Sequence, residues 1–67
     1  MDIRRRLGKN VSRLRRERDM SQEEFAFESG LHRTYISGIE RGARNPTVSV
    51  VQKMADALGV SPATLLK

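Results

Sequence analysis

The outward side of a predicted helix from Arg33 to Arg41 carries polar side chains that could do chemistry. Its members are Arg33, Thr34 and Ser37, with Gly38 beside them. A guanidinium and two hydroxyls can hydrogen-bond to the edges of bases or to phosphate. The other side carries Ile36 and Ile39 at a spacing of three, which predicts that an apolar core anchors this helix.

The net charge of +5 is unevenly distributed along the 67 residues. Residues 1–20 hold eight basic and three acidic side chains, whereas residues 21–32 hold three glutamates and no lysine or arginine. Residues 33–44 are basic again, with three arginines against Glu40. Such basic stretches suit a polyanion such as nucleic acid, although a solvated, solubilising surface would account for them equally well.

The size and composition of the chain exclude several classes of protein. We expect residues 1–67 to form one small domain with little room for a deep active-site cleft. With one histidine and no cysteine, we expect no enzyme, no metal site, no cofactor and no disulfide. The apolar runs are too short for a membrane span, and no signal-peptide pattern opens the chain. These features predict a cytoplasmic protein without a small-molecule ligand.

Capping residues and glycines predict where helices begin and end. The N-cap candidates are Asp2, Ser21 (with Glu24 in a capping box), Thr47 and Ser61, and helix-ending glycines stand at 30, 42 and 59. The predicted helices run from after Asp2 to near Asp19, from Gln22 to about Glu28, from Arg33 to Arg41, from after Thr47 to Leu58, and from Pro62 through Leu66. Apolar stripes line the first helix (Ile3, Leu7, Val11, Leu14) and the inner face of the fourth (Val48, Val51, Met54, Ala55, Leu58). The sequence therefore predicts an all-α, compact five-helix bundle.

The second and third predicted helices are joined by a very short turn. Gly30 lies in that turn, and the small Ala26 allows the two helices to approach closely. This arrangement is typical of a helix-turn-helix. In the DNA-binding version of the motif, the second helix lies in the major groove with its N-terminal residues at the base edges.

Three stretches cover most of the chain: LGKNVSRLRRERDMSQEEFA, SGLHRTYISGIERGARNPTV and MADALGVSPATLL. In order and spacing they resemble the Cro and phage-repressor type of helix-turn-helix regulators, also called the XRE family. The run LHRTYISGIERGARN is similar to the controller proteins of restriction–modification systems, a branch of that family. The resemblance implies a lambda-repressor-like fold and a transcriptional regulator that binds double-stranded DNA sequence-specifically.

The resemblance also implies which residues read bases. Arg33 and Thr34 match the exposed start of the recognition helix, where arginine can pair with guanine and threonine can contact a thymine methyl. Ser37 is a weaker candidate, because its short side chain reaches a base only where the helix lies deep. Gly38 departs from the family, many of whose members carry a longer side chain there. A close approach of the helix backbone and simple tolerance of glycine explain it equally well.

Contacts to the DNA backbone are implied for a second set of residues, namely Gln22, Tyr35, Arg41, Arg44 and Asn45. Such contacts supply affinity and salt dependence without reading sequence. Each of these residues could instead be ordinary surface, or core-edge packing in the case of Tyr35. Arg15 and Glu40 match a pair that forms an interhelical salt bridge, so we expect them to be structural.

Regulators that resemble this chain act as two-fold dimers on nearly palindromic operators. The last short helix is a common place for the dimer contact, so we expect Val60, Leu65 and Leu66 to contribute, either in free solution or only on DNA. The main alternative function is a protein-interaction or antitoxin-like module that uses exposed apolar residues such as Phe27. RNA binding is a third possibility, although stacking aromatics are scarce.

Overall fold

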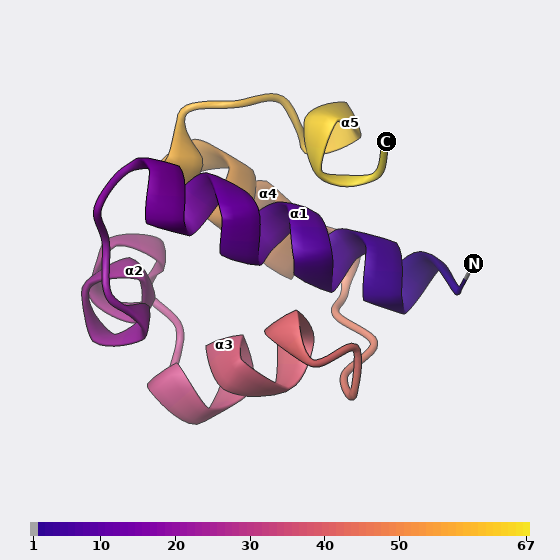
Figure 1. The fold of residues 1–67 in the computed structure, drawn as a ribbon, viewed down its shortest axis with the longest axis horizontal. Helices are drawn as coiled ribbons and strands as arrows, with labels where there is room; N and C mark the ends of the chain where they lie inside the picture. The colour runs from indigo at the N-terminus through magenta and orange to yellow at the C-terminus, as the bar shows by residue number, and fades with distance from the viewer. Residues whose placement is uncertain (1) are drawn as a thin grey trace.

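The structure is a computed structural model that describes residues 2–67. These residues form five helices, which are α1 (Ile3–Glu17), α2 (Gln22–Ser29), α3 (Arg33–Glu40), α4 (Val48–Leu58) and α5 (Pro62–Leu65). Figure 1 shows α1 crossing the middle of the molecule with α3 on one side and α5 on the other. α1 also contacts α4, while α2 contacts α3 and α4. The predicted all-α five-helix architecture is confirmed, with α1 at its centre.

Local hydrogen bonds fix the helix ends close to the predicted positions. The Asp2 carboxylate accepts a hydrogen bond from the Arg4 backbone N–H at 2.9 Å. Ser21 and Glu24 form the predicted capping box, with distances of 3.0 Å and 2.8 Å, and Thr47 accepts from the Val50 backbone N–H at 3.2 Å. α3 ends one residue earlier than predicted, at Glu40. Side chains that satisfy the first N–H groups of a helix thus define three of the starts.

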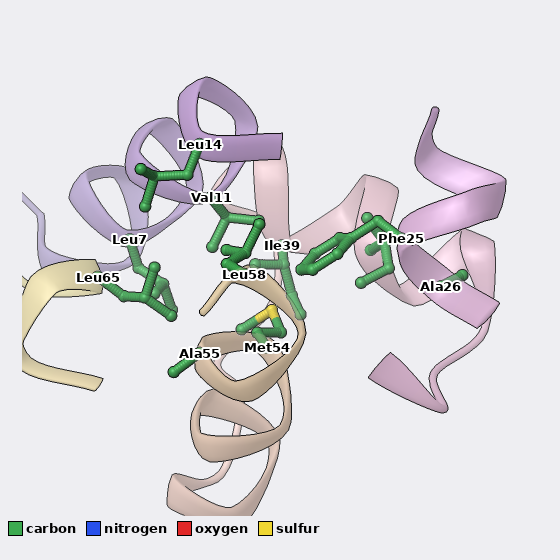
Figure 2. Packing of buried hydrophobic residues seen from close by; sticks show 11 residues of the cluster. Leu7, Val11, Leu14, Phe25, Ala26, Ile39, Met54, Ala55, Leu58 and Leu65 are labelled. Atoms are coloured by element: carbon green, nitrogen blue, oxygen red, sulfur yellow. The ribbon is translucent and has the colours of Figure 1, made fainter. Parts of the chain in front are cut away.

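The core is built from apolar side chains of every helix (Figure 2). Its buried members are Leu7, Val11, Leu14, Phe25, Ala26, Ile36, Ile39, Met54, Ala55, Leu58 and Leu65. Phe25 and Ile36 are fully buried, so α2 and α3 are both held by large apolar side chains in one shared core. This packing positions α3 with its remaining faces outside the core.

Two apolar residues lie differently from the prediction. Val48 was expected on the inner face of α4 but is 88% exposed. Val50 and Val51 in the same turn pack against the core, so Val48 lies at the exposed edge of the inner face. Leu65 was expected at a dimer surface but is fully buried. Its burial removes it as a contact to a second chain. Of the other two residues expected there, Leu66 is 40% exposed and Val60 is half-buried against the core.

The side chain of Asn10 on α1 helps to hold α5 in place. Its Nδ2 donates hydrogen bonds to the carbonyl oxygens of Leu65 at 2.8 Å and Lys67 at 3.1 Å. α5 is thereby tied to α1 across more than fifty residues of sequence. None of the helices within residues 2–67 has both the length and the apolar character needed to cross a membrane.

Candidate nucleic-acid interface

α2 and α3 meet at a turn formed by residues 30–32. Gly30 adopts the left-handed conformation at the end of α2, with φ of 73°, which glycine reaches without steric cost. The Leu31 N–H then donates to the Ala26 carbonyl at 2.9 Å, and the Leu31 side chain packs against the core. The turn is as short as the sequence predicts, and it gives α3 a fixed direction relative to α2.

α3 has an apolar inner face and a polar outer face. Ile36 and Ile39 are buried, with exposures of 0% and 1%. Arg33 and Thr34 are exposed at the start of the helix, and Ser37 is half-buried one turn later. The structure therefore brings the three residues predicted to contact bases together on one accessible helix surface.

Gly38 also belongs to the outer row of α3, but it is not open to solvent. The side chain of Arg44 covers it, so that a Cβ added to Gly38 would lie 2.7 Å from Arg44 Cγ. The Arg44 guanidinium lies over the ring of Tyr35, with Cζ 5.5 Å from the ring centroid. Gly38 was expected on the outward side of α3, but it is buried, because Arg44 occupies the space left by the absent side chain.

The end of α3 is held by a bidentate ion pair to α1. Arg15 Nε lies 2.7 Å from Glu40 Oε2, and Arg15 Nη2 lies 3.0 Å from Glu40 Oε1. Arg15 Nη1 donates to the Met20 carbonyl at 2.8 Å, and Gln22 Nε2 donates to Glu40 Oε1 at 3.1 Å. The interhelical salt bridge implied by the sequence is present. We call this group of four residues the clamp, since it joins α1, the following loop, α2 and α3.

The residues predicted to contact the DNA backbone surround the outer face of α3. Arg41, Arg44 and Asn45 are exposed in and beside the loop after α3, and Tyr35 is half-buried against the core. Gln22 stands at the start of α2, where its amide nitrogen is engaged by Glu40. Gln22 is therefore also a structural residue that links the start of α2 to the end of α3.

The clamp also sets the protonation of Glu40. Burial pushes the pKa of Glu40 upward, but hydrogen bonds from Arg15 and Gln22 and the charge of Arg15 outweigh it, so the pKa lies below its ordinary value. A carboxyl group with a depressed folded-state pKa stabilises the fold above its unfolded pKa, and that stability is lost as the pH falls through the folded-state pKa.

We therefore expect the free energy of unfolding to fall as the pH drops below about 4.5, the ordinary pKa of glutamate. Urea unfolding of the native protein and of Glu40→Gln between pH 6 and pH 3 measures this contribution, because the variant lacks the titrating group. Asp2 and Glu24, whose pKa values are lowered by hydrogen bonds from Arg4 and Ser21, titrate in both proteins. Identical pH slopes for the two proteins would contradict the role of Glu40.

Two residues that set how α3 and α5 lie against α1 were not singled out from the sequence. A Cβ on Gly8 would overlap the carbonyl oxygen of Ile39 and lie 2.8 Å from that of Glu40, so the backbones of α1 and α3 touch there. A glycine inside a regular amphipathic helix was the available signal, since it disfavours the helix by about 1 kcal/mol relative to alanine. Asn10, which holds α5, carries no comparable signal.

Fold and site together define a class of protein: a helix-turn-helix domain whose second helix presents an exposed arginine and threonine at its start. Residues 11–65 match the family described as HTH_3, helix-turn-helix. The chain belongs to this XRE-type helix-turn-helix family, as the sequence motifs led us to expect.

Relatives of known sequence are regulators and control proteins. The chain is 48% identical over 66 residues to the uncharacterized HTH-type transcriptional regulator y4dJ of Sinorhizobium fredii. The aligned region covers 98% of this chain and 86% of the relative. It is 50% identical over 66 residues to the control protein C.BamHI of Bacillus amyloliquefaciens, covering 97% of this chain and 82% of the relative.

Solved structures of restriction–modification controller proteins share the fold. C.AhdI of Aeromonas hydrophila matches with a TM-score of 0.90 and 40% identity, covering 92% of this chain and 94% of that one. C.Esp1396I, solved as a tetramer in complex with its natural 35-base-pair operator, matches with a TM-score of 0.87 and 35% identity, covering 97% and 86% of the two chains. The fold of this chain is thus that of transcriptional regulators with a helix-turn-helix.

Proposed function

We propose that this protein is a cytoplasmic transcriptional regulator without enzymatic activity that binds a nearly palindromic operator in double-stranded DNA. Residues 1–67 act as one DNA-binding domain, and α3 lies in the major groove. The observation that carries the proposal is the exposed pair Arg33 and Thr34 at the start of α3, a helix whose direction is fixed at its other end by Glu40. A rigid helix can hold base-reading side chains in register with the groove.

The roles divide between base and phosphate contacts. Arg33 donates two hydrogen bonds to a guanine, and Thr34 and Ser37 contact the neighbouring base pairs. Tyr35, through its hydroxyl, and Arg41 and Asn45 contact phosphates on either side of the groove. Gln22, at the start of α2, contacts the DNA backbone. The controller proteins among the relatives support this reading, since C.Esp1396I was solved on its operator.

Selection from a random duplex library at physiological salt tests the proposed function. The winning sequence is then titrated against scrambled DNA. We expect a nearly palindromic winner that is bound at least about a thousandfold more tightly than scrambled DNA. Failure to enrich any sequence, with only weak salt-sensitive binding, would contradict the proposal and favour a protein-interaction module at Phe27.

Arg33→Ala should weaken binding to the selected operator by about 1 to 3 kcal/mol and relax the preference at one base pair in each half-site. The matched control is Arg41→Ala, which removes the same charge at the opposite end of α3 but should weaken all DNA alike and lower the salt slope by about one. Fluorescence anisotropy on operator variants separates the two patterns. Equal losses for both substitutions on every DNA would mean that α3 does not read the bases.

An apolar patch at the other end of the loop after α3 supports pairing of two copies. Three of the large apolar side chains exposed within residues 2–67 gather there, with exposures of 51% for Ile3, 88% for Val48 and 40% for Leu66. They surround a hollow of about 270 Å³ that also touches Asn45 and Pro62. We propose this apolar patch as the dimer contact, in which Leu66 takes part but the buried Leu65 does not. Because the patch borders Asn45, pairing would bring the two loops that follow α3 close together.

Val48→Asp should weaken the dimer about tenfold or more, since a charge in an apolar contact costs at least about 1.4 kcal/mol. The substitution should leave the fold intact, because Val48 is 88% exposed and an acidic residue suits the first turn of a helix. Phe27→Asp is the matched control on α2, where the phenyl ring is 84% exposed. Sedimentation velocity measures the fraction of dimer in each of the two variants. A dimer that is lost with Phe27→Asp and kept with Val48→Asp would place the contact elsewhere.

A further inference from the structure

The side chain of Arg44 lies on the recognition helix although the residue belongs to the loop that follows it. Its Cγ, Nε and Cδ atoms lie 2.7, 3.2 and 3.5 Å from the position that a Cβ on Gly38 would occupy. Its guanidinium lies over the Tyr35 ring at 5.5 Å from the centroid, within the distance at which cation–π attraction operates. Arg44 itself is exposed. Its stem thus lies on α3 and its guanidinium lies over Tyr35.

The seat of Arg44 lies in the row of side chains proposed to face the groove. Gly38 comes one turn after Thr34 and just before Arg41 in this row, because residues three and four apart are neighbours on a helix. Because residue 38 is glycine, this row has no side chain at that position. Since the stem of Arg44 crosses the place of the missing Cβ, Arg44 supplies the functional group that residue 38 lacks.

We propose that Arg44 reads a base in the major groove, and that Gly38 is the seat that directs it there. This inference rests on the proposed function and replaces the phosphate contact expected from the sequence. A phosphate contact requires only a positive charge nearby, whereas a guanidinium stacked on a ring keeps its planar N–H edge available for two parallel hydrogen bonds. The seat and the ring also restrict the rotamers of Arg44 before binding, which lowers the entropy lost on binding. Guanine, with O6 and N7 as acceptors, is the base that such an edge recognises.

Substitutions of Arg44 test the proposal on the selected operator and its complete set of single-base-pair variants. We expect Arg44→Ala to abolish the preference for one G·C pair in each half-site, by about 5- to 140-fold, with a smaller loss on scrambled DNA. Arg44→Lys should keep the charge and the salt dependence but fail to restore the preference, because an ammonium lacks the planar fork. Uniform weakening by Arg44→Ala on every DNA, with recovery in Arg44→Lys, would establish a phosphate contact and overturn the inference.

Gly38→Ala tests the seat without altering Arg44. The added Cβ would lie 2.7 Å from Arg44 Cγ and should displace the stem, so we expect loss of the preference at the same base pair. The double variant Gly38→Ala/Arg44→Ala should show no further loss there, since both changes remove one contact. Alanine favours a helix more than glycine does, and circular dichroism verifies that the variant is folded. If Gly38→Ala keeps the preference for that base pair, the proposed role of Gly38 in directing Arg44 is wrong.

The outcome at Arg33 separates this inference from the proposed function. If Arg33→Ala relaxes its own base pair while Arg44→Ala acts uniformly, only the role of Arg44 fails. A native protein that enriches no sequence overturns both.

Discussion

Arg15→Met is expected to lower the free energy of unfolding by about 3 to 5 kcal/mol, because it leaves the Glu40 carboxylate buried without its counter-charge. The Glu40 side chain is only 8% exposed, and Gln22 would remain as its hydrogen-bond donor. The Met20 carbonyl would lose its donor as well. A domain of this size has a total stability of about 3 to 10 kcal/mol. The variant should therefore be close to unfolding at room temperature.

Two further variants distinguish the clamp from a general effect of charge. Arg15→Met/Glu40→Leu should be more stable than Arg15→Met alone, since the buried charge is then absent. Arg13→Met breaks an exposed pair with Glu17, 3.3 Å apart and 55% exposed on each side, and should change the stability by less than about 0.5 kcal/mol. Urea unfolding at neutral pH measures the free energy of unfolding of Arg15→Met, Arg15→Met/Glu40→Leu and Arg13→Met. A loss in Arg15→Met no greater than that in Arg13→Met would refute the structural role of the clamp.

Gly8→Ala is the second change from which we expect a large effect, with a loss of about 2 kcal/mol in stability. The added Cβ meets backbone carbonyl oxygens of Ile39 and Glu40, which cannot move aside without shifting α3 or α1. That shift would change the direction of the recognition helix, so operator binding should weaken even where the variant is folded. Thermal unfolding and anisotropy titration measure the two effects separately.

Gly38→Ala is the matched control for stability, since it makes the same change in another helix. There the Cβ meets only the flexible side chain of Arg44, so the stability should stay the same or rise by up to about 1 kcal/mol, as helix propensity predicts. A comparable gain in Gly8→Ala would show that α1 and α3 do not touch as closely as the structure indicates.

The helix boundaries could be predicted because the signals that set them are local. Ser21 with Glu24 satisfies N–H groups within one turn of itself, and Gly30 ends α2 by its own conformation. The recognition face followed from the same short-range logic, since the spacing of Ile36 and Ile39 determines which side of α3 points outward. The salt bridge between Arg15 and Glu40 was reached only through resemblance to a family, because nothing local links residues 25 apart.

The errors concern positions that packing between distant segments decides. Leu65 is the last residue of a helix of four residues, and Leu66 follows it as the C-cap. The helix is too short for periodicity to show which of the two leucines is buried. Gly38 belongs to the outer row, but the conformation of Arg44, six residues later, decides whether it is open. Val48 has the residue type of a core position, yet it is exposed at the edge of the inner face of α4.

The tie between Asn10 and α5 has a consequence for the order in which the chain assembles during its synthesis. A helix of four residues has no stability of its own in water, so α5 can form only against helices that already exist, namely α1 and α4. The apolar stripe of α1 that Leu65 covers is therefore buried only after residues 62–67 have left the ribosome. Until then the nascent chain keeps part of its future core in contact with water, and the earliest helix to be made is among the last to be fully enclosed.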